Sequence, residues 1–333
     1  MKHLCIINPM AGGLKGNAEK LIDEIKDFFA RNPRMENVIH ITRWKRDATG
    51  FAMRYVKNAS EMVRVYAFGG GGTLFEVING VAGLPNAQIA YYPLGIDDDL
   101  LVAFGKNSKE IFKSLRNLSL SPVIPVDTIL AGNHHAVSNI NIGIGASSFR
   151  AGIKLSDRFM LPLHLSYNLT AFYYSLVKTD VQRYLIELEN IELDEELTGI
   201  YVANSCGNGG GTPAPEARFN NGFIDLYLIK PAPGGIILKV LIDYQNGQYA
   251  KWPEYIRHYR CKKLRITSPK IITMILDGEV FYDMDLNLEI QPASVNFVCP
   301  SSIDKKFLEP PPAESVLVKD FTIRDFLPDG DNP

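Results

Sequence analysis

The sequence has few cysteines and no long apolar run, which argues against a disulfide-rich protein and a membrane-spanning one. Its 333 residues include only four cysteines, Cys5, Cys206, Cys261 and Cys299, and no two of them have the spacing of metal ligands. Scattered cysteines in apolar runs indicate reduced thiols rather than a disulfide framework. No apolar run reaches the roughly 18 residues that a membrane-spanning helix needs, and residues 1–7 lack the features of a signal peptide. We therefore expect a cytoplasmic protein.

The chain also lacks a strong excess of charge of either sign. Its net charge is −2 and its isoelectric point is about 6.3, so neither nucleic acid nor an anionic membrane should attract it as a whole. We expect no nucleic-acid partner, and any contact with a membrane surface would depend on a local patch. A length of 333 residues with 46% hydrophobic residues predicts two globular domains.

The first 122 residues alternate short apolar runs with segments of helical periodicity. This alternation is typical of a parallel sheet covered by helices, so we predict an α/β domain over residues 1–122. The predicted strands are 4–7, 38–42, 63–68 and 89–92, and the predicted helices are 17–29, 47–57 and 74–81, with one or two more before residue 118.

Residues 123–305 have a different sequence pattern, with many short β-type runs and few helical ones. We predict a β-rich, sandwich-like domain there. The predicted strands are 125–130, 135–142, 183–188, 198–204, 222–230, 263–267, 271–276 and 287–290, with helices near 163–177 and 236–243. The remaining residues, 306–333, form a tail that contains three consecutive prolines at 310–312. We expect the apolar residues of this tail to dock on the N-terminal domain.

The strongest chemical signal is a run of four glycines, Gly69, Gly70, Gly71 and Gly72, followed by Thr73. It lies between a predicted strand and a predicted helix, where exposed N–H groups and the helix dipole favour an anion. A tight turn is the plainer explanation, but a turn does not need four glycines. We interpret the loop as a phosphate site.

A second glycine-containing loop follows the first predicted strand and holds Asn8, Pro9, Ala11 and Gly12. Ligands of parallel sheets lie at the carboxyl ends of the strands, so the two loops should converge. Neither loop has the Walker A spacing or the dinucleotide-binding fingerprint.

The motifs of the chain resemble, in order, those of the diacylglycerol kinase catalytic-domain family. Asn8 to Gly12 is similar to N-P-x-[SA]-G, and Gly69 to Thr73 with Glu76, Asn79 and Gly80 is similar to G-G-D-G-T-x-x-E-x-x-N-G. The remaining matches are Pro93 to Asp99 with P-x-G-T-x-N-D, Asn141 to Gly145 with a glycine loop, Gly209 to Asp225 with G-G-G…P-x-A…D-D-G…D, and Asp277-Gly278-Glu279 with D-G-E.

The resemblance implies a two-domain fold of the NAD kinase and diacylglycerol kinase type. It also implies an ATP-dependent kinase that acts on the hydroxyl of diacylglycerol or a related lipid, with transient membrane-surface contact and a possible homodimer. Asp277 would be the general base with Glu279 beside it, although Asp-Gly alone predicts a hairpin turn. The implied nucleotide-binding residues are Asn8, Pro9, Ala11, Gly12, Thr42, Gly69, Gly70, Gly71, Gly72, Thr73, Glu76, Gly95 and Asp98.

The chain departs from the family pattern at positions that bear on Mg²⁺. Gly71 stands where the family has an aspartate, Asn220 and Asn221 replace two more, and Ile96 and Asp98 replace threonine and asparagine. Asp97 or Asp98 could supply the lost charge and hold Mg²⁺, or these carboxylates could simply favour a helix N-terminus.

These departures leave an alternative function open. The chain could be a catalytically degenerate kinase fold that binds nucleotide or lipid without turnover. An NAD kinase is a third interpretation, which the motifs of the second domain disfavour. The basic run from Arg257 to Arg265 could touch lipid headgroups or form an ordinary solvated face.

Overall fold

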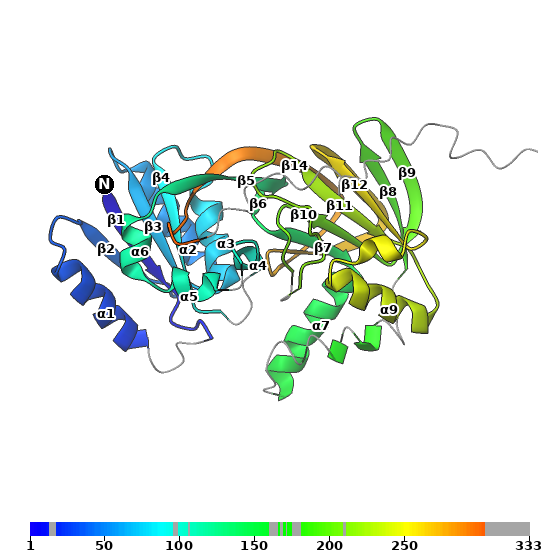
Figure 1. The fold of residues 1–333 in the computed structure, drawn as a ribbon, viewed down its shortest axis with the longest axis horizontal. Coiled ribbons are helices and arrows are strands. Elements are labelled where there is room, and N and C mark those ends of the chain that lie inside the picture. Colours follow the sequence, from blue (N-terminus) through cyan, green and yellow to red (C-terminus); the bar gives the residue numbers. More distant parts are fainter. Residues whose placement is uncertain are drawn as a thin grey trace, which may run out of the picture.

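The computed structural model describes residues 1–12, 18–95, 99–105, 107–159, 166, 169–170, 172–174, 181–208 and 211–303. Figure 1 shows two lobes that lie side by side, with the N-terminus in the first. The tail 306–333, and with it the predicted docking of that tail, lies outside the described residues.

The first lobe is built on a parallel sheet with the strand order β2-β1-β3-β4. Each strand is a short apolar run, and β3 is buried along its whole length because helices cover both of its faces. The elements are β1 (Lys2–Ile7), α1 (Ala18–Ala30), β2 (Asn37–Ile41), α2 (Asp47–Lys57), β3 (Val63–Gly69), α3 (Gly71–Val81) and β4 (Ala87–Pro93), followed by α4 (Asp99–Val102), α5 (Ser108–Phe112) and α6 (Leu115–Leu120).

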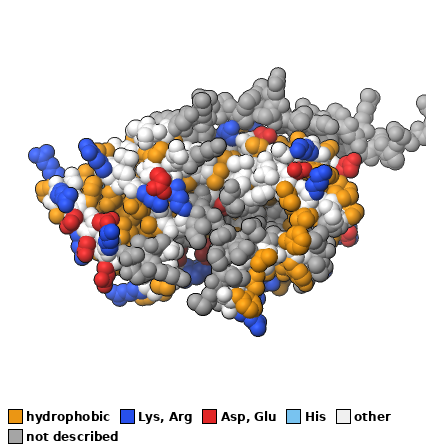
Figure 2. Space-filling model, turned by 60° about the horizontal axis from the view of Figure 1, so that its bottom comes forward, with side chains coloured by type: hydrophobic (Ala, Val, Ile, Leu, Met, Phe, Trp, Pro, Cys, Tyr) orange, Lys and Arg blue, Asp and Glu red, His pale blue; other side chains and the backbone are white. Residues whose placement is uncertain are grey.

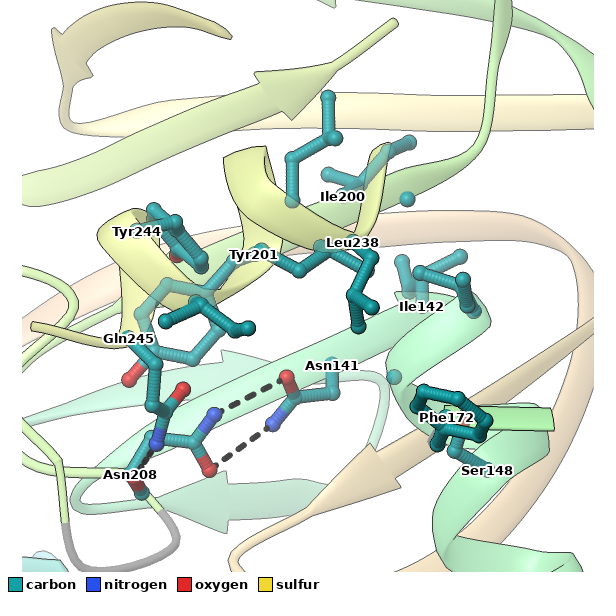
Figure 3. Close-up of a pocket in the computed structure, with 16 residues that line it drawn as sticks. Asn141, Ile142, Ser148, Phe172, Ile200, Tyr201, Asn208, Leu238, Tyr244 and Gln245 are labelled. Atoms are coloured by element: carbon teal, nitrogen blue, oxygen red, sulfur yellow. Dashed lines mark hydrogen bonds between the residues drawn. The ribbon is translucent and has the colours of Figure 1, made fainter. Parts of the chain in front are cut away.

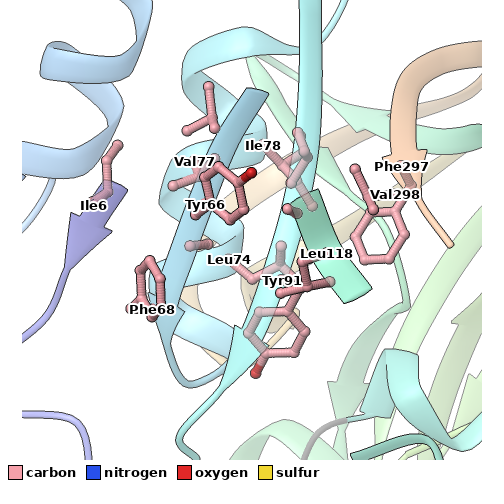
Figure 4. Close-up of a cluster of buried hydrophobic side chains, with 14 of the residues drawn as sticks. Ile6, Tyr66, Phe68, Leu74, Val77, Ile78, Tyr91, Leu118, Phe297 and Val298 are labelled. Atoms are coloured by element: carbon pink, nitrogen blue, oxygen red, sulfur yellow. The ribbon is translucent and has the colours of Figure 1, made fainter. Parts of the chain in front are cut away.

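The helices of this lobe lie on both faces of its parallel sheet (Figure 1). On one face the ring of Phe29 in α1 packs edge-on against Tyr66 of β3, and Arg64 of β3 donates to the backbone oxygen of Leu118 in α6 at 2.6 Å. α2 and α3 pack together on the opposite face. Figure 4 shows that Phe297 and Val298, from the far end of the chain, complete the same core.

The second lobe consists mainly of antiparallel strands with two described helices of more than ten residues. The elements are β5 (Val123–Ala131), β6 (His134–Ala136), β7 (Asn139–Gly143), α7 (Ile144–Phe159), β8 (Gln182–Leu188), β9 (Ile191–Leu197), β10 (Gly199–Ala203), β11 (Ile224–Ile229), α9 (Gly234–Gln245), the 3₁₀ helix η1 (Tyr249–Lys251), β12 (Ile256–Cys261), β13 (Lys263–Leu276) and β14 (Glu279–Val298).

Every residue of β10 and β11 is buried, although alternate residues of a strand point to opposite faces of a sheet. Ile200 and Leu226 face the main core of the second lobe. Tyr201 and Tyr227 face a smaller core that α9 covers. The predicted sandwich-like, β-rich architecture is therefore confirmed, with apolar layers on both sides of these strands.

One strand, β14, joins the two lobes. It pairs with β13 in the hairpin that contains the D-G-E motif, then with β5, and its end meets β4 of the parallel sheet at Phe297. Figure 1 shows this strand in orange along the top of the molecule. The position of Asp277 relative to the first lobe is thus fixed by a continuous sheet.

Several predicted elements of the second lobe differ from those observed. Residues 135–142 are predicted as one strand but form β6 and β7, with a break at Val137 and Ser138. The sequence analysis missed β9, β12 and the α7 helix, and most of the predicted helix at 163–177 lies outside the described residues. None of the described helices has the length and apolarity needed to cross a bilayer.

Candidate active site

The glycine loop connects β3 to α3 in the geometry of an anion site. β3 ends at Gly69, Gly70 is the N-cap residue, and its backbone oxygen accepts the N–H of Thr73 at 3.0 Å. A Cβ on Gly69 would lie 2.1 Å from the Thr73 hydroxyl, so only glycine fits there. The free N–H groups and the positive end of the α3 dipole therefore face the same space.

The loop after β1 lies directly beside the glycine loop. The backbone N–H of Asn8 donates to the Phe68 oxygen at 3.0 Å, and its side-chain Nδ2 donates to the Thr73 hydroxyl at 3.2 Å. The Asn8 Oδ1 accepts the N–H of Met10 and so turns the chain at Pro9. These bonds bring together two loops that are 65 residues apart.

The two loops form one side of a cavity of about 430 Å³. The rest of its wall comes from the segment after β2, from the first turn of α2, from α3, and from Glu279 of the second lobe. The lining residues are Asn8, Met10, Ala11, Gly12, Thr42, Arg43, Trp44, Lys45, Ala48, Gly70, Gly72, Thr73, Glu76 and Glu279.

Nine of the residues predicted for the site line this cavity, and the other predicted residues that the structure describes do not. Glu76 lines it, but its carboxylate accepts the N–H groups of Arg46 and Ala48 at 2.7 and 3.2 Å, at the start of α2. Gly95 lies behind the loop, 3.4 Å from where a Gly70 Cβ would be. Pro9, Gly69, Gly71 and Asp277 also lie outside the lining, and Asp97 and Asp98 lie outside the described residues.

Asp277 sits at the tip of the β13–β14 hairpin, as Asp-Gly predicts, with a φ of 45° and with Gly278 at 90°. Its carboxylate accepts the N–H groups of Val137, Ser138 and Asn139 at 2.6, 2.9 and 3.0 Å. Burial raises the pKa of Asp277 to about 6, although the three N–H donors favour the charged form. Through these three bonds the carboxylate holds the break between β6 and β7.

Glu279, two residues further on, has a different environment. Its Oε1 lies 3.1 Å from the position of a Cβ on Gly72, and its Oε2 pairs with the Lys45 ammonium at 2.5 Å. Its side chain is 24% exposed and faces the cavity. Of the two carboxylates of the D-G-E motif, Glu279 is the one that a ligand in the cavity can reach.

A second cavity of about 340 Å³ lies in the second lobe, between β7, β10, α7 and α9. Its walls are mainly apolar, and Figure 3 shows the polar side chains of Asn141, Asn208 and Gln245 at one end. Asn141 donates to the side chain of Asn139 at 2.8 Å, and the backbone N–H of Asn139 donates to Asp277. A chain of hydrogen bonds therefore joins the polar end of this cavity to the D-G-E hairpin.

The described residues do not offer Mg²⁺ a ready set of ligands. Within the ranges that the structure describes, no three His, Cys, Asp or Glu side chains come close enough to hold a metal. Gly71 contributes no side chain, and Asp127, near Asn220 and Asn221, uses its carboxylate to accept the N–H groups of Gly222 and Ala293, each at 2.8 Å. We therefore assign no metal ligand.

Sequence reasoning missed the cations and amides of this region. Arg43, Trp44 and Lys45 follow β2 as part of the run R-W-K-R, a signal that could have marked an anion site after a strand. Asn139 and Asn208 carry no comparable signal, because their role depends on strands that meet only in the fold.

The fold and these loops define a two-domain protein with a loop-lined cavity at the edge of a parallel sheet. Residues 2–131 match the model of the diacylglycerol kinase catalytic domain, and residues 140–299 match that of the YegS C-terminal NAD kinase beta sandwich-like domain. Together the matches span most of the chain. The chain belongs to the diacylglycerol kinase catalytic-domain family, whose members are lipid kinases.

Individual relatives are distant. The "Probable lipid kinase YegS-like" protein of Shewanella frigidimarina is 25% identical over 248 residues, covering 73% of this chain and 78% of its own length. The diacylglycerol kinase of Bacillus subtilis is 25% identical over 249 residues, covering 73% and 79%. A crystal structure of a Bacillus anthracis chain assigned to the diacylglycerol kinases superposes with a TM-score of 0.73 at 22% identity, over 91% of this chain and 96% of that one. This last likeness establishes the fold.

Proposed function

We propose that the protein is an ATP-dependent kinase of a membrane lipid alcohol such as diacylglycerol. The observation that carries the proposal is that three features of the structure are connected in space. These are the anion-binding cavity at the glycine loop, the reachable carboxylate of Glu279 at its edge, and an apolar cavity joined to the same hairpin through Asn139 and Asn141.

ATP would place its phosphates against the N–H groups of Gly70 and Gly72 at the start of α3, where the helix dipole stabilises negative charge. Phosphoryl transfer depends mainly on positioning and on neutralising that charge. Mg²⁺ bound to ATP would contribute to the neutralisation.

We assign the general base to Glu279 and a positioning role to Asp277. The resemblance implies Asp277 as the base, but its oxygens already accept three N–H bonds. In the proposed reaction the lipid hydroxyl gives its proton to Glu279, its oxygen forms a bond to the γ-phosphorus, and the bond from that phosphorus to the departing ADP breaks.

The apolar cavity suits the lipid part of such a substrate. Ser148 lines it, and its buried hydroxyl has no hydrogen-bond partner among the described residues, so a polar group of the lipid can pair with it. Figure 2 shows hydrophobic side chains gathered along the lower edge of this lobe. The exposed hydrophobic side chains of the second lobe include Phe159, Leu169, Phe172, Tyr173 and Ile242.

Membrane contact through this edge fits the charges nearby. Arg150, Lys154 and Arg158 are exposed and four residues apart, so they form one stripe along α7. Such a stripe beside apolar side chains suits an anionic bilayer surface. The basic run after residue 256 suits it less, since Arg257 pairs with Glu195 and Arg260 with Asp225.

A kinase assay tests the proposal. With radiolabelled ATP, Mg²⁺ and diacylglycerol in mixed micelles, we expect transfer of phosphate to the lipid. Leu241→Trp, which fills the apolar cavity, should lower lipid phosphorylation about tenfold or more without weakening ATP binding, whereas Leu120→Trp, on an exposed position of the first lobe, should have no effect. If ATP does not bind at millimolar concentration, the proposal is wrong.

The second candidate, a degenerate kinase that binds without turnover, rests on Gly71. A Cβ there would meet only the Asp277 backbone oxygen, at 3.8 Å, so Gly71→Asp should fold normally. We expect this variant to bind ATP about tenfold more tightly with Mg²⁺ than without it, as measured by calorimetry. Equal dependence on Mg²⁺ in wild type and variant would show that the missing carboxylate is not the defect.

A further inference from the structure

The segment after β2 brings a cation into the proposed phosphate site. Lys45 lines the cavity, and its ammonium pairs with Oε2 of Glu279 at 2.5 Å. This contact crosses between the lobes, because Lys45 belongs to the first lobe and Glu279 to the second. The ammonium therefore pairs with a carboxylate in this structure and would also face the phosphates of a nucleotide bound in the cavity.

The backbone around Lys45 is fixed, whereas its side chain is not. The N–H of Thr42 donates to the Ile7 oxygen at 2.9 Å, that of Arg43 to the Asp47 carboxylate at 2.9 Å, and that of Arg46 to Glu76 at 2.7 Å. The Lys45 side chain is 68% exposed. A change of partner for Lys45 thus requires only rotation of its own side chain.

An exchange of partner is energetically easy. Ion pairs as exposed as Lys45–Glu279 stabilise a protein by at most about 1 kcal/mol, and a triphosphate carries more charge than one carboxylate. Hydrogen bonds to phosphate from an ammonium are among the stronger ones. The phosphates of a nucleotide in the cavity should therefore replace Glu279 as the partner of the Lys45 ammonium.

We propose that Lys45 is a phosphate-binding residue and that nucleotide binding, by drawing Lys45 away, frees Glu279 to accept the proton of the lipid hydroxyl. Before ATP arrives, Glu279 is held by Lys45. The base becomes available only when the phosphoryl donor is in place, so ATP binds before the lipid reacts. This inference rests on the proposed function and adds an order of events to it.

A double-mutant cycle, with ATP affinity measured by calorimetry, tests the exchange. Lys45→Met should weaken ATP binding about tenfold, the loss of a charged hydrogen bond. Glu279→Gln should strengthen it about two- to fivefold, because Lys45 no longer has a competing partner. In the double variant the gain from Glu279→Gln should disappear. Lys57→Met, at the exposed end of α2, is the matched control and should bind ATP like wild type.

The outcomes separate this inference from the proposed function. If Glu279→Gln strengthens ATP binding equally with and without Lys45, the carboxylate only repels phosphate and the exchange does not occur. In that case wild-type ATP binding still supports the kinase. If wild type binds no ATP, both proposals fail. Acylation of Lys45, followed by mass spectrometry, gives a second readout: ATP should slow it severalfold in wild type and leave Lys57 unaffected.

Discussion

Replacing Asp277 with asparagine is expected to lower the free energy of unfolding by about 3 kcal/mol. The carboxylate accepts three N–H bonds, two on Oδ1 and one, from Val137, on Oδ2. An asparagine amide can keep an oxygen toward one side only, and its NH₂ group then faces an N–H donor. Chemical denaturation followed by circular dichroism would measure the change.

The control for this variant is Asp283→Asn. Asp283 is exposed on β14, where it accepts the N–H groups of its neighbours Met284 and Asp285, so we expect a change within about 0.5 kcal/mol. If Asp277→Asn is as stable as wild type but inactive, the carboxylate takes part in the chemistry itself, and our positioning role for it is wrong.

Replacing Glu279 with glutamine is expected to lower turnover without lowering stability, unlike the change at Asp277. Removal of a general base lowers turnover by roughly 10²- to 10⁴-fold, while the Glu279 side chain, which faces the cavity, contributes little to folding. The lipid kinase rate at saturating ATP should therefore fall, with the unfolding midpoint unchanged. ATP binding should persist, since the glycine loop is intact.

Glu289→Gln is the matched control, because it removes a carboxylate from an exposed position of the same strand, far along β14. It should retain wild-type turnover. A fall in turnover of less than about threefold in Glu279→Gln would contradict the assignment of the base and return attention to Asp277.

Much of the first lobe could be predicted from the sequence, because its signals are local. The apolar runs of β1 and β3 are short and bounded by Asn8-Pro9 and by the glycines, and the α2 range agrees with the prediction. Parallel strands place their carboxyl ends on one edge, so the meeting of the Asn8 and Gly70 loops follows from topology. The division of the chain at residue 122 stays a prediction.

The second lobe was harder to predict, because its strands depend on distant partners. β12 contains Arg257, His258 and Arg260, a polar pattern that is stable in a strand only because Asp225 of β11 accepts bonds from His258 and Arg260. The break at Val137 and Ser138 exists because Asp277, about 140 residues away, accepts their N–H groups. Periodicity cannot reveal such partners.

The sequence by itself determined the family, the glycine loop between β3 and α3, and the D-G-E hairpin, because each depends on residue types at short, fixed spacing. Only the tertiary structure decided how the two carboxylates of that hairpin differ. β14 and the break between β6 and β7 enclose Asp277 among N–H donors, while Glu279 projects into the cavity beside Lys45. The chemistry of a carboxylate depends on the groups that surround it, and here those groups come from both lobes.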